Sequence, residues 1–403
     1  MYFYRVSQPK SHMKENESAL FSRYIIDGIH CDATPYELLG ECMADIDTGY
    51  DPENEYADII DESTDPPLTS FTYRNEDNQT YIEEVAGYRQ DRPFRILYPE
   101  TFTKTRIAAA LLERLWNKGH YKLGDLAVWI EWDWNSKPLG NMATFYKSAK
   151  SASEYIYDLG CHLEGYSYDG SDEESWMRVA AWLPEAEDME GLDENEEITN
   201  DVARPLFKSS PYESSHPWIS EDRQCPEMVE NIRDSQLLYI PFETSPFRLG
   251  GSLLAEIKGH NGGTPPQISD PDYFIDCYEV VRELVEDGFI AAGVTIADGG
   301  LAKAVQDICG QMGIQMNLKG IMTSYMDDDT TRILFSEIPG VIVQVDTCDM
   351  DYIDSQLLLQ DVAYYPIGSP DNKFTGIRLE EGRTVTVAGI LESLINQATE
   401  GED

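Results

Sequence analysis

The sequence has few basic residues. It contains 30 Lys and Arg against 74 Asp and Glu, for a net charge of −44 over 403 residues. Nucleic acids and anionic membrane surfaces are bound through clustered Lys and Arg side chains, so neither is an expected partner. The excess of acid favours solubility and leaves open a basic protein partner.

Motifs built on cysteine and histidine are also scarce. The seven cysteines form no CxxC pair, which excludes a zinc ribbon or thioredoxin motif and fits reduced thiols. The six histidines do not pair at metal spacing, and GxSxG and HExxH are missing, so hydrolase and zincin chemistry are unsupported. No apolar run reaches the roughly 18 residues of a membrane helix, and the N-terminus lacks a signal-peptide core. We therefore expect a cytoplasmic protein without a membrane partner.

The length and a hydrophobic content of 41% predict two to three domains with a sizeable core. Periodicity predicts helices over 33–43, 103–117, 141–159, 273–287, 302–311, 351–360 and 387–397. Alternation and apolar runs predict strands over 80–88, 94–98, 126–134, 176–183, 237–242, 332–336, 340–346, 362–367 and 374–380. Because helices and strands do not follow strict βαβ order, the predicted class is α+β.

Three tryptophans, Trp129, Trp132 and Trp134, stand close together in the strand predicted over 126–134. Such clusters are typical of a core, and a base-stacking platform is the alternative. The acidic run over 45–67 is broken by prolines and predicts a solvated loop or linker, with partner binding as the alternative.

Two glycine-rich turns, each leading towards a helix, are the most ligand-like feature of the sequence. Such turns expose backbone N–H groups at the positive end of a helix dipole, which suits a phosphate. The alternative is a packing role, since neither turn is a Walker A loop or a Rossmann fingerprint. The candidate phosphate-binding residues are Gly250, Gly251, Ser252, Asp298, Gly299 and Gly300.

Several of these segments occur in the order found in a known family. The sequence resembles phosphoribosylformylglycinamidine synthase, the glutamine- and ATP-dependent enzyme of purine biosynthesis, and in particular the second of its two AIR-synthase-like halves. The resemblance covers roughly residues 80–400 and is strongest from 235 onward. The segments that carry it are 237–242, 249–252, 265–273, 297–301 and 334–340, and more weakly 106–116, 132–135 and 146–160.

This resemblance implies an α+β protein with a half-barrel N-terminal domain over 76–234 and a layered C-terminal domain over 235–403. Residues 1–75 form an additional acidic segment of unknown fold. The half-barrel implies a homodimer or a complex with a related AIR-synthase-like protein. The family also makes ATP and magnesium possible ligands, with Asp298 and Glu337 as candidate metal ligands.

The sequence departs from the family where chemistry is expected. The family's His-Asp-x-Ser is replaced by Val294–Ala297, and its Gly-Lys-Asp-Ser by Gly165–Tyr168. The catalytic first half and the glutaminase domain are expected to be missing. Transfer of a phosphoryl group from magnesium-ATP needs the cationic charge that these changes remove. We therefore predict a non-catalytic binding protein without catalytic residues. The alternatives are an ATP-dependent amidotransferase subunit that needs a partner half, and an acidic protein that binds a basic partner.

Overall fold

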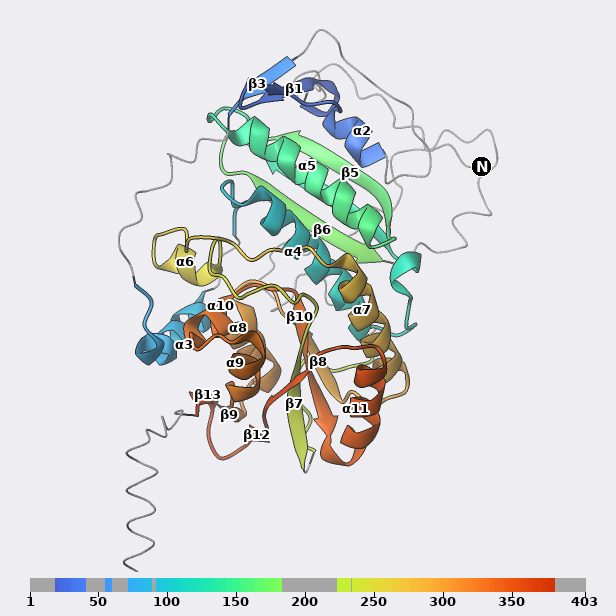
Figure 1. The fold of residues 1–403 in the computed structure, drawn as a ribbon, viewed down its shortest axis with the longest axis vertical. Helices are drawn as coiled ribbons and strands as arrows, with labels where there is room; N and C mark the ends of the chain where they lie inside the picture. The colour runs from blue at the N-terminus through green and yellow to red at the C-terminus, as the bar shows by residue number, and fades with distance from the viewer. Residues whose placement is uncertain are drawn as a thin grey trace, which may run out of the picture.

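The computed structural model describes residues 19–40, 55–59, 72–88, 92–182, 223–232 and 234–380 (Figure 1). The helix predicted over 387–397 and most of the acidic run over 45–67 lie outside these ranges. Within them, helices and strands are mixed and most strand pairs are antiparallel, so the predicted α+β class is confirmed. None of the described helices is both long and apolar enough to cross a membrane.

The N-terminal unit is built on a three-stranded sheet. Strand β4 (Ala127–Trp134) lies between the parallel strand β5 (His162–Gly170) and the antiparallel strand β6 (Trp176–Trp182). Helices α4 (Pro99–Leu112) and α5 (Asn141–Asp158) pack together over one face of this sheet (Figure 1). Trp132 and Trp134 are fully buried against Phe145, which confirms the core prediction for two of the three tryptophans.

Local sequence explains where these two helices begin and end. Pro99 stands in the first turn of α4, where its fixed φ suits a helix. The helix therefore begins four residues before the predicted position, and it continues from Glu113 to Trp116 as a 3₁₀ turn. Helix α5 begins after Gly140, whose φ is 89°, and is followed by Gly160 with a φ of 67°, close to the predicted ends.

Residues 19–40 and 55–59 form a small layer over α5 (Figure 1). This layer contains β1 (Arg23–Ile26), β2 (Ile29–His30), α2 (Pro35–Gly40) and β3 (Glu55–Asp58). The predicted helix after Thr34 is present over a shorter span. Its start is fixed by a capping box, in which Thr34 N–H donates to Glu37 at 2.8 Å and Glu37 N–H donates to the Thr34 hydroxyl at 3.2 Å.

The C-terminal unit contains a four-stranded antiparallel sheet, ordered β11 (Tyr365–Gly368), β7 (Ser235–Pro241), β10 (Gly340–Asp346) and β8 (Ala292–Thr295). Alternate residues of β10 enter two separate cores: Val341 and Val343 face one, and Ile342 faces the other. The first core is covered by α7 (Pro271–Glu286) and α11 (Met350–Leu359). The second is covered by α8 (Gly300–Cys309), α9 (Lys319–Tyr325) and α10 (Thr330–Phe335), on the other side of the sheet in Figure 1.

The remaining elements are short. A second sheet of this unit has the order β12 (Pro370–Asp371), β9 (Gly313–Met316) and β13 (Gly376–Leu379). Helix α6 spans Leu253–Ile257. Single 3₁₀ turns lie at Asn75–Asp77, Leu123–Asp125 and Thr347–Asp349.

Three strand predictions are wrong. Residues 80–88 lie largely in helix α3 (Asn78–Gly87), residues 332–336 lie largely in α10, and residues 94–98 contain no strand. In α3, the buried residues Tyr81, Ile82 and Val85 recur at helical spacing, so tertiary packing overrides their strand propensity. Helix α3 precedes the three-stranded sheet in the chain, yet it packs against α6 and α8 of the C-terminal unit.

Candidate functional site

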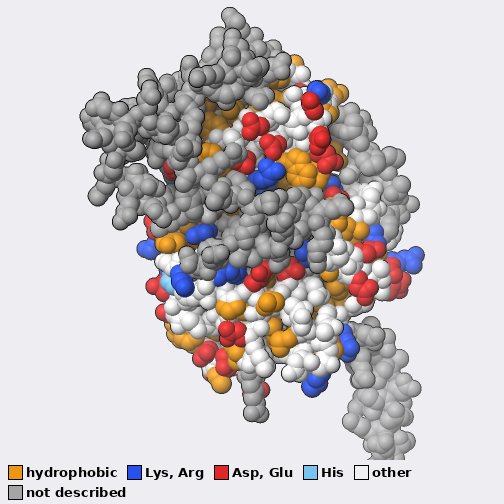
Figure 2. Space-filling view, turned by 180° about the vertical axis from the view of Figure 1, so that it is seen from behind, with side chains coloured by type: hydrophobic (Ala, Val, Ile, Leu, Met, Phe, Trp, Pro, Cys, Tyr) orange, Lys and Arg blue, Asp and Glu red, His pale blue; other side chains and the backbone are white. Residues whose placement is uncertain are grey.

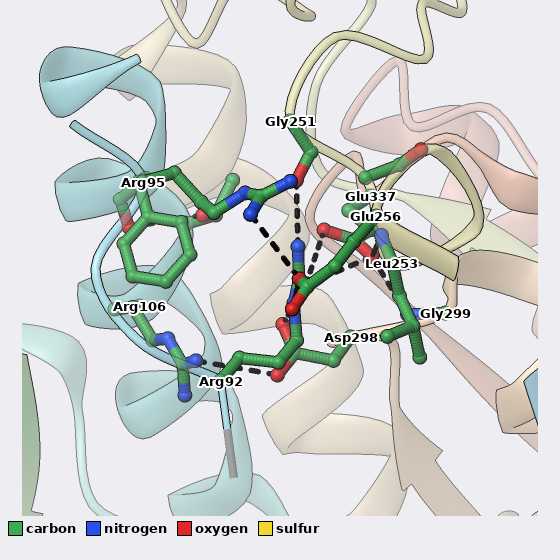
Figure 3. Close-up of polar contacts among 12 residues, drawn as sticks. Arg92, Arg95, Arg106, Gly251, Leu253, Glu256, Asp298, Gly299 and Glu337 are labelled. Carbon is green, nitrogen blue, oxygen red and sulfur yellow. Dashed lines mark hydrogen bonds and ion pairs between the residues drawn. The ribbon is translucent and has the colours of Figure 1, made fainter. Parts of the chain in front are cut away.

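The structure brings the two glycine turns together beside Glu337, as Figure 3 shows. The first turn leads into α6, where the Ser252 hydroxyl accepts the N–H of Ala255 at 3.3 Å. The second turn leads into α8, with Gly299 in the left-handed region at a φ of 90°. All six residues of the candidate phosphate-binding set therefore belong to one site.

Both turns are tightly packed. A Cβ atom on Gly250 would lie 2.3 Å from the carbonyl oxygen of Gly263, and a Cβ atom on Gly300 would lie 2.7 Å from that of Ser336. These backbone contacts leave no room for a side chain. Two of the glycines are therefore required by the fold itself, independently of any ligand.

The backbone N–H groups of the turns already have acceptors within the chain. Gly250 donates to Thr264 O at 3.0 Å, Gly251 to Asn261 O at 2.8 Å, and Gly300 to Ala297 O at 3.0 Å. A phosphate would have to compete with each of these bonds. The hydrogen-bonding capacity that suggested a phosphate site is thus used by the loops that surround it.

A carboxylate takes the place where the two turns meet. Glu337 Oε1 accepts the N–H of Leu253 at 2.8 Å and the N–H of Gly299 at 2.8 Å. One oxygen thus accepts the first free N–H group of each turn, as an anion bound at a helix N-terminus would. Glu337 was predicted as a metal ligand, and here it acts as an internal anion.

A buried arginine, which no sequence pattern indicated, completes the site. The Arg92 side chain is fully buried and donates to Asp298 at 2.6 Å, Glu337 at 3.0 Å and Glu256 at 3.0 Å (Figure 3). It also donates to the carbonyl oxygen of Gly251 at 2.6 Å. Its guanidinium therefore occupies the centre of three carboxylates, where a bound cation would otherwise compensate their charge.

Two further arginines lie at the edge of this cluster. Arg95 lies 3.5 Å from the carboxylate of Glu256, and Arg106 lies 3.2 Å from that of Asp298. The Arg106 guanidinium also stands over the Phe102 ring, 4.8 Å from its centroid. Arg92, Arg95 and Arg106 together balance the three carboxylates, and we call these six side chains the Arg92 cluster.

The electrostatics of the cluster follow from burial and pairing. Burial alone would raise the pKa of Asp298, but Arg106 and Arg92 outweigh it and hold that pKa below its usual value. Burial raises the pKa of Glu337 above its usual value, because the lowering by Arg92 is offset by the neighbouring Asp298. Burial by itself would lower the pKa of Arg92, but the three carboxylates raise it by more than burial lowers it. The pKa of Arg92 is therefore above its usual value, and Arg92 stays charged.

The space that remains next to the first turn is small. A cavity of about 20 Å³ is lined by Arg95, Tyr98, Gly251 and neighbouring residues, which is room for about one water molecule. A nucleotide pocket is typically larger by an order of magnitude. In the described part of the chain, no three His, Cys, Asp or Glu side chains are arranged to hold a metal ion. The predicted magnesium ligands Asp298 and Glu337 both bind Arg92 instead.

The segments that depart from the family have packing roles. Thr295 accepts a hydrogen bond from the Trp116 indole at 3.0 Å, and Val294 is fully buried in β8. In β5, a Cβ atom on Gly165 would lie 2.5 Å from the Trp129 ring, so this glycine leaves space for the tryptophan. None of these positions carries a positively charged side chain that could bind a phosphate.

Known proteins were compared with the chain. No family model matches it. It is 24% identical over 304 residues to a probable phosphoribosylformylglycinamidine synthase, chloroplastic/mitochondrial, of Arabidopsis thaliana, an alignment that covers 72% of this chain and 19% of that protein. It is 30% identical over 125 residues to the phosphoribosylformylglycinamidine synthase of Schizosaccharomyces pombe, covering 30% and 9%. The chain thus spans about a fifth of the length of these relatives at most.

Among solved structures, T. maritima PurL complexed with FGAR has a TM-score of 0.47 and 11% identity, covering 76% of this chain and 48% of that one. The chain is an α+β protein. More particularly, it is similar to phosphoribosylformylglycinamidine synthases, which confirms the resemblance predicted from its sequence segments.

Proposed function

We propose that the chain is a non-catalytic relative of phosphoribosylformylglycinamidine synthase that acts as a binding or interaction protein. The Arg92 cluster is the observation that carries this proposal. Glu337 accepts the N–H groups that could bind a phosphate, and Arg92 binds the carboxylates that could hold a metal ion. Arg92, Asp298 and Glu337 therefore satisfy one another and are not available to a substrate.

The energetics support this proposal. To admit magnesium-ATP, the protein would have to displace Arg92 from three carboxylates and break the hydrogen bonds to Glu337. Breaking a buried ion pair typically costs about 3–5 kcal/mol, which a nucleotide would have to supply from its own binding energy. We therefore expect no nucleotide binding at physiological concentration.

A melting experiment tests this directly. The full chain is melted alone, with magnesium chloride, with ATP, and with both at millimolar concentration. We expect all four curves to coincide, because a ligand that does not bind leaves the stability unchanged. A ligand that binds the folded protein would, at a hundred times its Kd, add about 2.7 kcal/mol to the stability and shift the curve. A shift seen only with magnesium and ATP together would overturn the proposal, as would formation of a formylglycinamidine product from ATP and ammonia or glutamine.

The second candidate is an ATP-dependent amidotransferase subunit that works with a partner. It is favoured by the comparison itself, since most of this chain aligns with only 19% of the plant relative. Another protein would then supply the remaining parts of the enzyme. Co-purification from the source cell under native conditions distinguishes the two candidates, because this one requires a synthase-like or glutaminase partner.

We also propose that the three-stranded sheet pairs with a second half-barrel, either in a homodimer or in a related protein. Trp129 and Trp176 lie half-buried on the face of the sheet opposite to Trp132 and Trp134. The Trp129 Nε1 atom has no hydrogen-bond partner among the described residues. Sedimentation velocity tests this: the wild type should be dimeric and Trp129→Ser mostly monomeric, whereas Tyr157→Ser, on exposed α5 surface, should not differ from the wild type.

A cytoplasmic location stays a prediction.

A further inference from the structure

Helix α11 presents an apolar stripe to solvent. Its residue Tyr352 is 41% exposed, Leu358 is 65% exposed and Leu359 is 76% exposed. These side chains lie on one side of the helix, while Ile353 and Leu357 on the other side are buried in the core of the C-terminal unit. The solvent-facing side of the helix therefore presents three large apolar side chains together with the exposed Asp351 and Ser355, an arrangement that fits an interaction surface.

This stripe continues onto the end of the neighbouring helix. The Phe289 ring, which follows α7, stacks on the Tyr352 ring with centroids 4.4 Å apart and planes at 30°. Helices α7 and α11 pack side by side, as Figure 1 also shows. Phe289, Tyr352, Leu358 and Leu359 form what we call the α11 stripe.

Acidic residues surround the α11 stripe, and basic residues are missing from its sequence. No Lys or Arg occurs between positions 333 and 372. Asp351 and Asp361 are exposed at the two ends of α11, and Glu286 and Asp287 are exposed beside Phe289.

The nearest basic side chain in the sequence of α7 is already paired. Arg282 binds Glu279 at 2.9 Å, Glu286 at 3.0 Å and Glu283 at 3.4 Å. It therefore contributes no net positive charge to the α11 stripe. Figure 2 shows the molecule from behind, where acidic, basic and hydrophobic side chains are interspersed over the lower part of the described surface.

We propose that the α11 stripe binds an amphipathic helix of another protein, with apolar side chains along one face and Lys or Arg on either side. The apolar stripe supplies contact area, and the acidic border selects a basic partner. A second copy of this chain does not fit, because a two-fold interface would place the same acidic borders against each other. This site is separate from the Arg92 cluster and does not depend on the proposed loss of catalysis.

A synthetic peptide tests the site. The probe is a fluorescently labelled amphipathic helix with a leucine face flanked by Lys and Arg, and the mismatched probe carries Glu at the basic positions. Binding to the full chain is measured by fluorescence anisotropy at several salt concentrations. We expect saturable binding of the basic peptide that weakens as salt rises, and no binding of the acidic one.

Variants locate the binding on α11. The pair Leu358→Ser and Leu359→Ser should weaken the basic peptide at least tenfold, and Asp351→Asn with Asp361→Asn should weaken it about two- to threefold and reduce its salt dependence. The control pair Leu139→Ser and Tyr157→Ser removes apolar side chains that are 62% and 72% exposed elsewhere, and it should leave binding unchanged. Equal weakening by the control pair, no effect of the α11 pair, or concentration-dependent self-association through α11 would each overturn the proposal.

Discussion

Carboxylates satisfy backbone N–H groups at several places in the molecule, and two of these places differ in what surrounds the carboxylate. At the glycine turns, Glu337 accepts two N–H groups and is held by the buried Arg92. At the start of α5, Asp58 accepts the N–H groups of Gly140, Met142 and Ala143 at 2.8, 3.0 and 3.1 Å.

The difference lies in the neighbouring charges. Asp58 faces the positive end of an 18-residue helix, and no Lys or Arg side chain pairs with it among the described ion pairs. Glu337 lies beside a second carboxylate, Asp298, and depends on an arginine far away in the sequence. The comparison indicates that a helix end can hold an acid alone, whereas two neighbouring, partly buried acids need a cation.

The largest effect is expected from Arg92→Met, which keeps side-chain volume and removes the charge. Three partly buried carboxylates would lose their shared partner, and loss of a buried partner costs about 3–5 kcal/mol. Urea unfolding should show this as a lower midpoint. The control is Arg178→Met, whose side chain is 47% exposed and pairs with Asp133; it should cost about 1 kcal/mol or less. Equal effects would mean that the Arg92 cluster contributes no more than a surface ion pair.

A glycine substitution tests whether the turn beside Glu337 is kept for packing. Gly250→Ala places a methyl group 2.3 Å from a carbonyl oxygen, so we expect a loss of about 2–3 kcal/mol without any ligand present. The control is Gly87→Ala at the end of α3, where a Cβ atom meets nothing within 4 Å and φ is not positive. It should be close to neutral in the same urea titration. A neutral Gly250→Ala would show that the turn has room to spare.

The sequence predicted the frame of this site but not its centre. Helices α5 and α7 and strands β4, β7 and β10 follow from periodicity and caps, because those signals are local. Arg92 lies 206 residues from Asp298 and 245 from Glu337, and no local pattern marks a lone arginine as their partner. The loss of polar groups at Val294–Ala297 indicated that catalytic residues of the family are replaced. The arginine that neutralises the remaining carboxylates is visible only in three dimensions.

The pH dependence of Arg92→Met separates charge repulsion from lost packing. The pKa of Glu337 is raised in the folded state. Its contribution to stability is therefore present below its unfolded pKa of about 4.3 and is lost as the pH rises through the folded value. Asp298, whose pKa is lowered, contributes in the opposite direction and loses its contribution as the pH falls. Without Arg92, the term from Glu337 should dominate, so the deficit relative to wild type should shrink as the pH falls from 7 to 5.

A second substitution checks the same cause by removing one of the repelling charges. Adding Glu337→Gln to Arg92→Met keeps an oxygen that can accept from Leu253 and Gly299, and it should recover about 1–2 kcal/mol at pH 7. The recovery should be smaller at pH 5, because a lower pH favours the neutral form of Glu337, whose pKa is raised. A deficit that is independent of pH and is not reduced in the double variant would assign the loss to packing instead of charge.

The smallest effect is expected at the carboxylate that has no arginine. Asp58→Ala should cost about 1–2 kcal/mol, as loss of a helix N-cap does. Asp58→Asn keeps an acceptor oxygen and should recover at least half of that loss, since the helix end needs a hydrogen-bond acceptor more than a charge. Hydrogen exchange at the first turn of α5 provides a second measurement, because the N–H groups of Met142 and Ala143 should lose protection in Asp58→Ala alone. If Asp58→Asn were as destabilising as Asp58→Ala, the charge itself would be required, and the two carboxylates would differ less than their surroundings indicate.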